Sequence, residues 1–346
     1  MEKINIVPKG FDFSPDEWKN ATLNKHPLVV VPFISDICSA DCIYCMMAQE
    51  REMKHYDKVS LEEHEIVLRK AYENGCRTIV ITGLGEPFLD KIFFDKDNMS
   101  FPLLDIAEKI GMYTIVFSNC ISITEEIANI LVERKIAIIA KLSSLNKSTF
   151  EYLNGCKISF CTYTSKSGKI YEIPNYIKYL LDAGFTKLDK NATRLIADVI
   201  ITKRNFNDII DIMELANDTN MLVCLDPLVI KDNAKININE IGINYEENRR
   251  LYQEIKEKYQ EYDMAMFDLS KCIIHHNGFV YDLEGNVRQC LSVPSNVGNV
   301  RVDDVGELIR KIMQQKEAAT EMYDIKAKED IFGKCPGRCY YSGIHA

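Results

Sequence analysis

The sequence predicts an α/β protein: a parallel sheet of six β/α units, either a partial (β/α)6 barrel of the TIM type or an open sheet, followed by a small C-terminal α+β domain with a β-hairpin and a helix. Three observations lead to this prediction. Six short apolar runs alternate with helical patterns over residues 28–228, as in a parallel sheet whose crossovers are helices. The runs are apolar almost throughout, which is typical of strands covered on both faces. Beyond residue 271 the pattern changes to a hairpin, a short helix and a tail rich in Cys and Gly.

Size and composition exclude several classes of protein. The chain has 346 residues, 47% hydrophobic and 27% charged, so it can bury a core without disulfides. Its formal net charge of −9 argues against non-specific binding to nucleic acid or anionic lipid, which requires an excess of Lys and Arg. No apolar run reaches the length of a membrane span, and the N-terminus lacks the apolar core of a signal peptide. We therefore expect a cytoplasmic protein with no nucleic-acid or membrane partner.

The predicted elements divide the chain into four segments. They are an N-terminal extension, the barrel, a helical linker and the C-terminal domain, at residues 1–27, 28–235, 236–268 and 269–346. The predicted strands are residues 28–35, 77–82, 112–118, 136–142, 195–201 and 221–228. The predicted helices between them are residues 60–74, 102–110, 124–134, 174–183 and 207–216.

Local signals support the helix boundaries. Ser60 and Glu63 have the spacing of a capping box. Gly75, Gly111 and Gly184 stand where helices should end. With parallel strands, we expect the chemistry at the carboxyl ends of the strands.

Three cysteines follow the first predicted strand with the spacing CxxxCxxC: Cys38, Cys42 and Cys45. Three thiolates can hold three corners of a 4Fe–4S cluster and leave the fourth iron open for substrate or cofactor. The alternatives are a zinc site or buried free thiols. Zinc would require a fourth ligand, and no His or Cys follows before His55.

This motif on the loop after the first barrel strand resembles the radical S-adenosylmethionine (SAM) superfamily. Tyr44 matches the family aromatic residue that packs beside the adenine of SAM. The segment TGLGEP, with Gly83, Gly85 and Glu86, matches the family segment that binds the amino group of SAM. Glycines allow a close approach of backbone to cofactor, and Glu86 supplies a charge partner for an ammonium.

The resemblance implies further contacts with SAM at strand ends. The residues in these positions are Ser118, Asn119, Lys141, Ser143 and Arg194. A solvated strand end is the alternative for each. Asp198 and Asn205 are similar cases, and Arg194 or Asp226 could face substrate instead of SAM.

A second group of cysteines lies in the C-terminal segment: Cys272, Cys290, Cys335 and Cys339. Four thiolates suit a structural zinc or a closed 4Fe–4S cluster. Behind a radical SAM barrel, this segment resembles the SPASM/twitch domain, which implies one auxiliary 4Fe–4S cluster. A cluster with four protein ligands has no open iron, so its expected role is to relay electrons.

The resemblance implies an oxidoreductase that cleaves SAM reductively and uses the 5′-deoxyadenosyl radical to remove a hydrogen atom from substrate. Our leading hypothesis is oxidation of a sugar or aminocyclitol alcohol, as in the sugar-modifying radical SAM dehydrogenases, with the auxiliary cluster accepting the electron. The expected electron donor is a flavodoxin- or ferredoxin-type protein.

Three alternatives stay open. The first is an epimerase of a sugar or peptide, in which Cys224 on the sixth strand returns a hydrogen atom to the substrate radical. The second is a ribosomal-peptide maturase with a peptide substrate. The third is a non-enzymatic iron–sulfur or zinc protein that senses redox state, although a sensor would not need the Glu86 segment.

Overall fold

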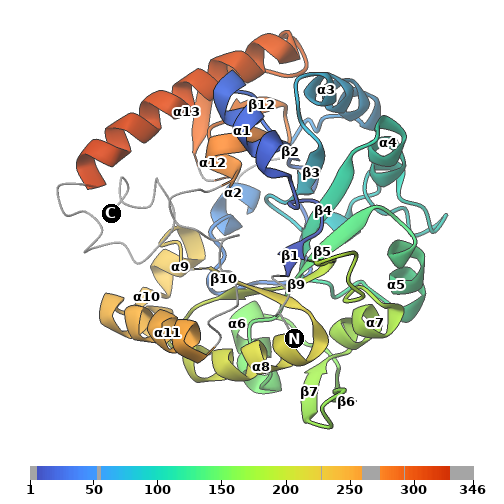
Figure 1. Ribbon diagram of the computed structural model, residues 1–346, viewed down its shortest axis with the longest axis vertical. Coiled ribbons are helices and arrows are strands. Elements are labelled where there is room, and N and C mark those ends of the chain that lie inside the picture. Colours follow the sequence, from blue (N-terminus) through green and yellow to red (C-terminus); the bar gives the residue numbers. More distant parts are fainter. Residues whose placement is uncertain (1–5, 53–55, 227, 259–272, 292, 328–346) are drawn as a thin grey trace.

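A nine-stranded mixed sheet organises this computed structural model (Figure 1). The structure describes residues 6–52, 56–226, 228–258, 273–291 and 293–327. The strand order in the sheet is β10-β9-β5-β4-β3-β2-β11-β12-β13. The strands are β2 (Val29–Pro32), β3 (Thr78–Ile81), β4 (Tyr113–Ser118), β5 (Ile136–Lys141), β9 (Leu195–Ile200), β10 (Leu222–Asp226), β11 (Gly278–Tyr281), β12 (Asn286–Arg288) and β13 (Pro294–Asn299). All neighbours from β10 to β11 are parallel, and β12 and β13 are antiparallel.

Helices follow most of the parallel strands and ring the sheet (Figure 1). The helices are α1 (Pro15–Asn24), α2 (Ala48–Glu52), α3 (Leu61–Glu73), α4 (Pro102–Ile110), α5 (Glu125–Val132), α6 (Lys147–Asn154), α7 (Asn175–Ala183), α8 (Ile209–Thr219), α9 (Asp232–Ile236), α10 (Ile238–Ile241), α11 (Tyr245–Lys258), α12 (Ile273–Asn277) and α13 (Val305–Ala327). Two single 3-10 turns lie at Pro87–Leu89 and Phe206–Asp208. The predicted capping box of α3 is present, since the side chains and backbones of Ser60 and Glu63 bond reciprocally.

Two apolar clusters lie on the two faces of the sheet because side chains alternate along each strand. The outer cluster joins the sheet to α3, α4, α5, α7 and α8, with Ile79 and Val116 among its strand residues. The inner cluster contains residues of the opposite phase, such as Val31, Val80 and Cys224, together with Ala21 of α1. The strands are thus buried on both faces, as their continuous apolar runs predict.

The α/β class is confirmed, and all six predicted strands and five predicted helices are present with small changes at their ends. The barrel closure and the twitch domain stay predictions. The predicted C-terminal hairpin does form, from β11 and β12, but it continues the main sheet, since β11 pairs with β2. The sequence reading missed α1, α6 and two small sheets, β1 (Val7–Pro8) with β8 (Ala192–Thr193) and β6 (Phe160–Thr164) with β7 (Ile170–Pro174). Within the described residues, no helix has the length and apolar character needed to cross a membrane.

Candidate functional site

The loops that carry the predicted site residues leave one edge of the sheet. Cys38 follows β2, Glu86 follows β3, Asn119 follows β4 and Ser143 follows β5. These four strands are parallel neighbours, so their carboxyl ends meet at the same edge. The structure therefore brings together residues that lie more than 100 positions apart in sequence.

The carboxyl end of α6 holds the loop that carries the three cysteines. The Asp41 N–H donates to the Asn154 carbonyl at 3.1 Å. The Ile43 N–H donates to the Leu153 carbonyl, also at 3.1 Å. Gly155 follows with a φ of +57°, and a Cβ there would lie 2.2 Å from the Asp41 carbonyl oxygen. Both the left-handed backbone and the close approach require glycine at this position.

Cys38, Cys42 and Cys45 are near one another on this loop. Burial raises the pKa of the Cys42 thiol to about 12, with Cys45 and Cys38 adding to the rise and the Lys141 ammonium opposing it. Burial also raises the pKa of Cys38. The side-chain amide of Asn119 donates to Cys38 Sγ at 3.7 Å. Three gathered thiols, one of which already receives an N–H, fit the donor set of a three-cysteine iron–sulfur cluster.

Tyr44 is buried between the cysteine loop and β5. Its hydroxyl lies 2.9 Å from Ser143 Oγ and also donates to Asn154 Oδ1. The Lys141 ammonium lies 5.4 Å from the centre of its ring. The hydroxyls of Tyr44 and Ser143 are thus hydrogen-bonded within the protein. Packing of the Tyr44 ring beside an adenine stays a prediction.

Glu86 is fully buried and receives three hydrogen bonds. Ser118 Oγ donates to Glu86 Oε1 at 2.7 Å, and the Asn119 N–H donates to Oε2 at 2.7 Å. The Phe88 N–H donates to Oε1 at 3.2 Å. Burial raises the pKa of Glu86 to about 7, and these three donors oppose the rise. A carboxylate has about four acceptor positions, so Glu86 can still accept a bond from an ammonium.

Two glycines bring the Glu86 turn against the cysteine loop. A Cβ at Gly85 would lie 2.2 Å from the Ile37 carbonyl oxygen, which itself accepts from the Glu86 N–H at 2.7 Å. Gly83 has a φ of +132° and would place a Cβ 2.7 Å from the Phe33 ring. The close approach that these glycines allow is therefore to the chain's own segment before Cys38.

A polar row crosses the neighbouring strands β5, β9 and β10 at the same edge. Lys141 pairs in register with Asp198, and Asp198 pairs with Cys224. Lys141 Nζ forms an ion pair with Asp198 Oδ2. Burial alone would lower the pKa of Lys141, but the Asp198 and Asp226 carboxylates outweigh it and raise the pKa. Ligand atoms of Asp198, Cys224 and Asp226 lie within 4.8 Å of one another.

Arg194 does not join this group. It precedes the first residue of β9, and its guanidinium donates to the carbonyls of Val132 at 2.7 Å and Arg134 at 3.2 Å. Its guanidinium carbon also lies 5.0 Å from the centre of the Phe185 ring. These partners lie at the amino ends of the strands, opposite the cysteine loop. The expectation that Arg194 contacts SAM is corrected by this placement, and we do not carry it forward.

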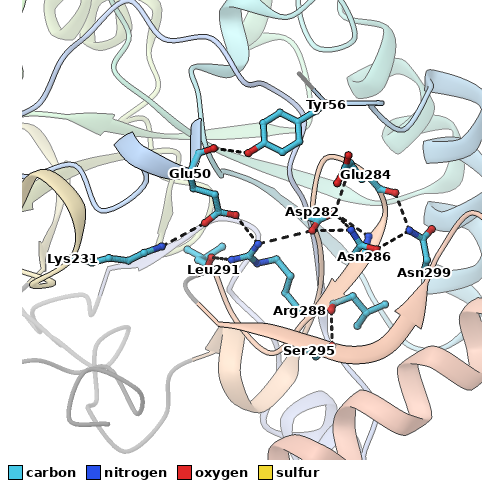
Figure 2. A network of polar contacts seen from close by, with 11 residues as sticks. Glu50, Tyr56, Lys231, Asp282, Glu284, Asn286, Arg288, Leu291, Ser295 and Asn299 are labelled. Carbon is cyan, nitrogen blue, oxygen red and sulfur yellow. Dashed lines mark hydrogen bonds and ion pairs between the residues drawn. The ribbon is translucent and has the colours of Figure 1, made fainter. Parts of the chain in front are cut away.

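The loop that continues from Cys45 is joined to the C-terminal hairpin by buried Arg288 (Figure 2). Arg288 Nη1 donates to Glu50 Oε1 of α2 at 2.8 Å, and Nη2 donates to the Leu291 carbonyl at 3.1 Å. Lys231 Nζ lies 3.4 Å from the other oxygen of Glu50. Cys290, two residues after Arg288, is buried. The other predicted auxiliary ligands lie outside the described residues: Cys272, Cys335 and Cys339.

Asn154 is a residue of this site that the sequence reading missed. It accepts from Tyr44 and Ser143, and Cys42 Sγ lies 3.7 Å from its Oδ1. An Asn–Gly pair at the end of a short polar helix was the available signal, because it marks a helix terminus. Its contact with the cysteine loop spans more than 100 residues and leaves no trace in local sequence.

The chain is similar to one curated protein and to several solved structures, while no family model matches it. It is 25% identical over 193 residues to a GTP 3′,8-cyclase of Saccharophagus degradans. That match covers 54% of this chain and 50% of the cyclase, so it spans about half of the relative. SuiB of Streptococcus suis, bound to S-adenosylmethionine, gives a TM-score of 0.59 at 18% identity over 86% of this chain and 71% of SuiB. Native anSMEcpe with bound AdoMet gives 0.58 at 15% identity over 90% of both chains. These likenesses establish a shared fold.

Proposed function

We propose that this chain is a radical SAM enzyme that binds a 4Fe–4S cluster through Cys38, Cys42 and Cys45. One observation carries the proposal: Asn119 joins the cysteine loop to the predicted SAM-binding turn. Its backbone N–H donates to Glu86 and its side-chain amide to Cys38, at 2.7 Å and 3.7 Å. A metal site alone would not need a buried carboxylate beside it. The SAM-bound neighbours of the same fold support this proposal.

When bound, the cluster would supply one electron to SAM, which yields methionine and a 5′-deoxyadenosyl radical. Glu86 would accept a hydrogen bond from the amino group of SAM, since its carboxylate retains acceptor capacity. Buried Tyr44 and the inner apolar cluster would exclude water from the radical. A flavodoxin- or ferredoxin-type protein is the proposed electron donor.

The reaction that we favour is dehydrogenation of a sugar or aminocyclitol alcohol. Removal of a carbinol hydrogen atom leaves a substrate radical, which becomes a ketone when it loses one electron and one proton. The proposed acceptor of the electron is an auxiliary 4Fe–4S cluster on Cys290 with Cys272, Cys335 and Cys339. The link from Glu50 to Arg288 supports this, because it joins α2, the helix that follows the cysteine loop, to the strand that leads to Cys290.

Iron and sulfide content after anaerobic reconstitution tests this pair of clusters. We expect about eight irons per chain in the wild type and about four in the Cys38/Cys42/Cys45→Ala variant. Four irons or fewer in the wild type, with bound zinc, would remove the electron acceptor and with it the dehydrogenase proposal.

An epimerase is the second candidate, and the placement of Cys224 favours it. The side chain is buried in the inner apolar cluster, two residues before the carboxyl end of β10. A thiol there could return a hydrogen atom to a substrate radical. For this candidate, Cys224→Ala should still cleave SAM but should not invert a substrate centre, and solvent deuterium should enter the product only in the wild type.

A peptide is the remaining substrate class. SuiB has been solved bound to its precursor peptide SuiA, and its fold is similar to this chain over 85% of the chain. A peptide substrate predicts tight binding to a leader peptide. Absence of such binding would leave a small molecule as the substrate.

A further inference from the structure

The chain that follows β10 packs against the loop of the three cysteines. Helix α9 lies beside α2, the helix after that loop (Figure 1). Ala234 of α9 and Ile241 of α10 form a small apolar cluster with Tyr44 and Leu153. The proposed function gives no role to α9, so its contacts with the proposed cluster site need a separate explanation.

Asn233, near the start of α9, bridges two of the proposed cluster ligands. Its side-chain amide donates to the Cys42 carbonyl at 3.1 Å, and its backbone N–H donates to the Cys45 carbonyl at 3.2 Å. The Cys42 carbonyl also accepts from the Cys45 N–H at 3.0 Å. A carbonyl oxygen has two lone pairs, so both of those on Cys42 are used. One residue, 191 positions away from Cys42, thus holds the backbone of two thiol-bearing residues.

The residue before Asn233 has a strained backbone. Asp232 has a φ of +49° and is only 9% exposed. Its Oδ2 accepts from the Gln49 N–H of α2 at 3.1 Å, and the preceding Lys231 pairs with Glu50 of the same helix. Strained residues persist where the surrounding contacts hold them, and they gather at functional sites. The strain is thus located where three consecutive residues bind the cysteine loop or the helix that follows it.

Asn237 makes the same kind of bond to a residue of the loop that carries no thiol. Its side-chain amide donates to the Ile43 carbonyl at 3.0 Å and to the Asn233 carbonyl at 2.9 Å. Both amides therefore hold the same loop from neighbouring turns of the chain. Of these two, only Asn233 contacts residues whose side chains are proposed ligands.

We propose that Asn233 is a positioning residue for the 4Fe–4S cluster, which holds Cys42 and Cys45 at the spacing that iron binding requires. This rests on the proposed function and goes beyond it, because it assigns a residue far outside the CxxxCxxC motif. A free loop loses conformational freedom whenever its thiolates bind iron, whereas a loop held by Asn233 has lost that freedom on folding. The bridge should slow the loss of iron, since a thiolate that dissociates stays close enough to bind again. Outer partners that orient metal ligands act in this way at other metal sites.

The test is the rate at which the full-length reconstituted protein, reduced and without oxygen, releases iron to the chelator ferrozine. The phase of release that is missing from the Cys38/Cys42/Cys45→Ala variant belongs to this cluster. Asn233→Ala and Asn233→Leu should release this iron about fivefold faster than the wild type, the factor expected for one lost hydrogen bond. Leucine has nearly the shape of asparagine but no donor, so it separates the hydrogen bond from packing. Asn233→Gln keeps an amide and should release iron more slowly than Asn233→Leu.

Asn237→Ala is the matched control, because it removes the same kind of bond from the same loop but not from a ligand residue. It should change the rate by less than about twofold. The cluster-free forms of Asn233→Leu and Asn237→Ala should unfold at the same temperature, which shows that faster release is not general loss of stability. If Asn233→Leu fails to fold, Asn233→Ala and Asn233→Gln still test the proposal.

Three results would each overturn this inference and leave the proposed function standing. They are a wild-type rate in the Asn233 variants, an equal acceleration in Asn237→Ala, and release from Asn233→Gln as fast as from Asn233→Leu. A wild type that holds no iron on its three motif cysteines would instead refute the proposed function, and this inference with it.

Discussion

Replacement of Gly85 by alanine should push the Glu86 turn away from the cysteine loop in the proposed site. The new Cβ would lie 2.2 Å from the Ile37 carbonyl oxygen and 2.7 Å from the Ile37 nitrogen. Both are backbone atoms, so no side-chain rotation can relieve the contact. Normal contact requires about 1 Å more, and overpacking of this kind costs roughly 1–3 kcal/mol in the free energy of unfolding.

The required shift acts on the bond that docks the Glu86 turn. The Glu86 N–H donates to the Ile37 carbonyl at 2.7 Å, and a displacement of about 1 Å would break this bond and cost roughly 1 kcal/mol more. Gly306→Ala is the control, since a Cβ there comes no closer than 3.2 Å, to the flexible side chain of Asp304. Urea unfolding should show a loss of about 2–4 kcal/mol for Gly85→Ala only, and SAM affinity should fall about tenfold or more. Equal stability and equal SAM binding in the two variants would refute the reasoning.

Three further changes test other parts of the site. Glu86→Gln should reduce the pH dependence of the unfolding free energy. Folding raises the pKa of Glu86 from 4.5 to about 7, so the wild type should lose stability as pH rises through this interval, and the variant should lose less. Parallel curves of unfolding free energy against pH would contradict this. Lys141→Met should destabilise the fold by about 3 kcal/mol, because it leaves the Asp198 charge buried and uncompensated. Adding Asp198→Asn should restore part of the lost stability, measured by thermal unfolding. A double variant less stable than Lys141→Met would count against a buried ion pair. Gly155→Ala should lower the free energy of unfolding by roughly 1–3 kcal/mol more than Gly168→Ala. Both glycines have a positive φ, but only at Gly155 would the new Cβ lie 2.2 Å from a backbone atom, the Asp41 carbonyl oxygen. Equal losses would show that Asp41 does not resist the new methyl group.

Local sequence signals were sufficient for the six strands predicted between residues 28 and 228 and for the linear motifs. The six apolar runs mark six of the seven parallel strands of the main sheet, because each of these strands is buried on both faces. Cys38 and Glu86 could be placed at one edge because each lies on the loop after a strand, and neighbouring parallel strands end together. The same rule would have excluded Arg194, which precedes its strand and therefore lies at the opposite edge.

Contacts between distant segments could not be predicted in this way. Asn154 meets Tyr44 only because α6 returns to the cysteine loop, and nothing in its neighbouring residues encodes that contact. The hairpin of β11 and β12 was visible from its turn, but its pairing with β2 depends on the whole sheet being assembled. The polar row of Lys141, Asp198 and Cys224 likewise depends on the register of three strands.

Reductive cleavage of SAM tests the central claim most directly. The full-length wild type and the Cys38/Cys42/Cys45→Ala variant are reconstituted without oxygen, reduced with dithionite and supplied with SAM, and 5′-deoxyadenosine is measured by mass spectrometry. We predict that the wild type forms 5′-deoxyadenosine and methionine in equal amounts and that the variant forms neither. No cleavage by a wild type whose three cysteines hold an iron–sulfur cluster, or a site filled by zinc, would contradict the account and favour a redox sensor.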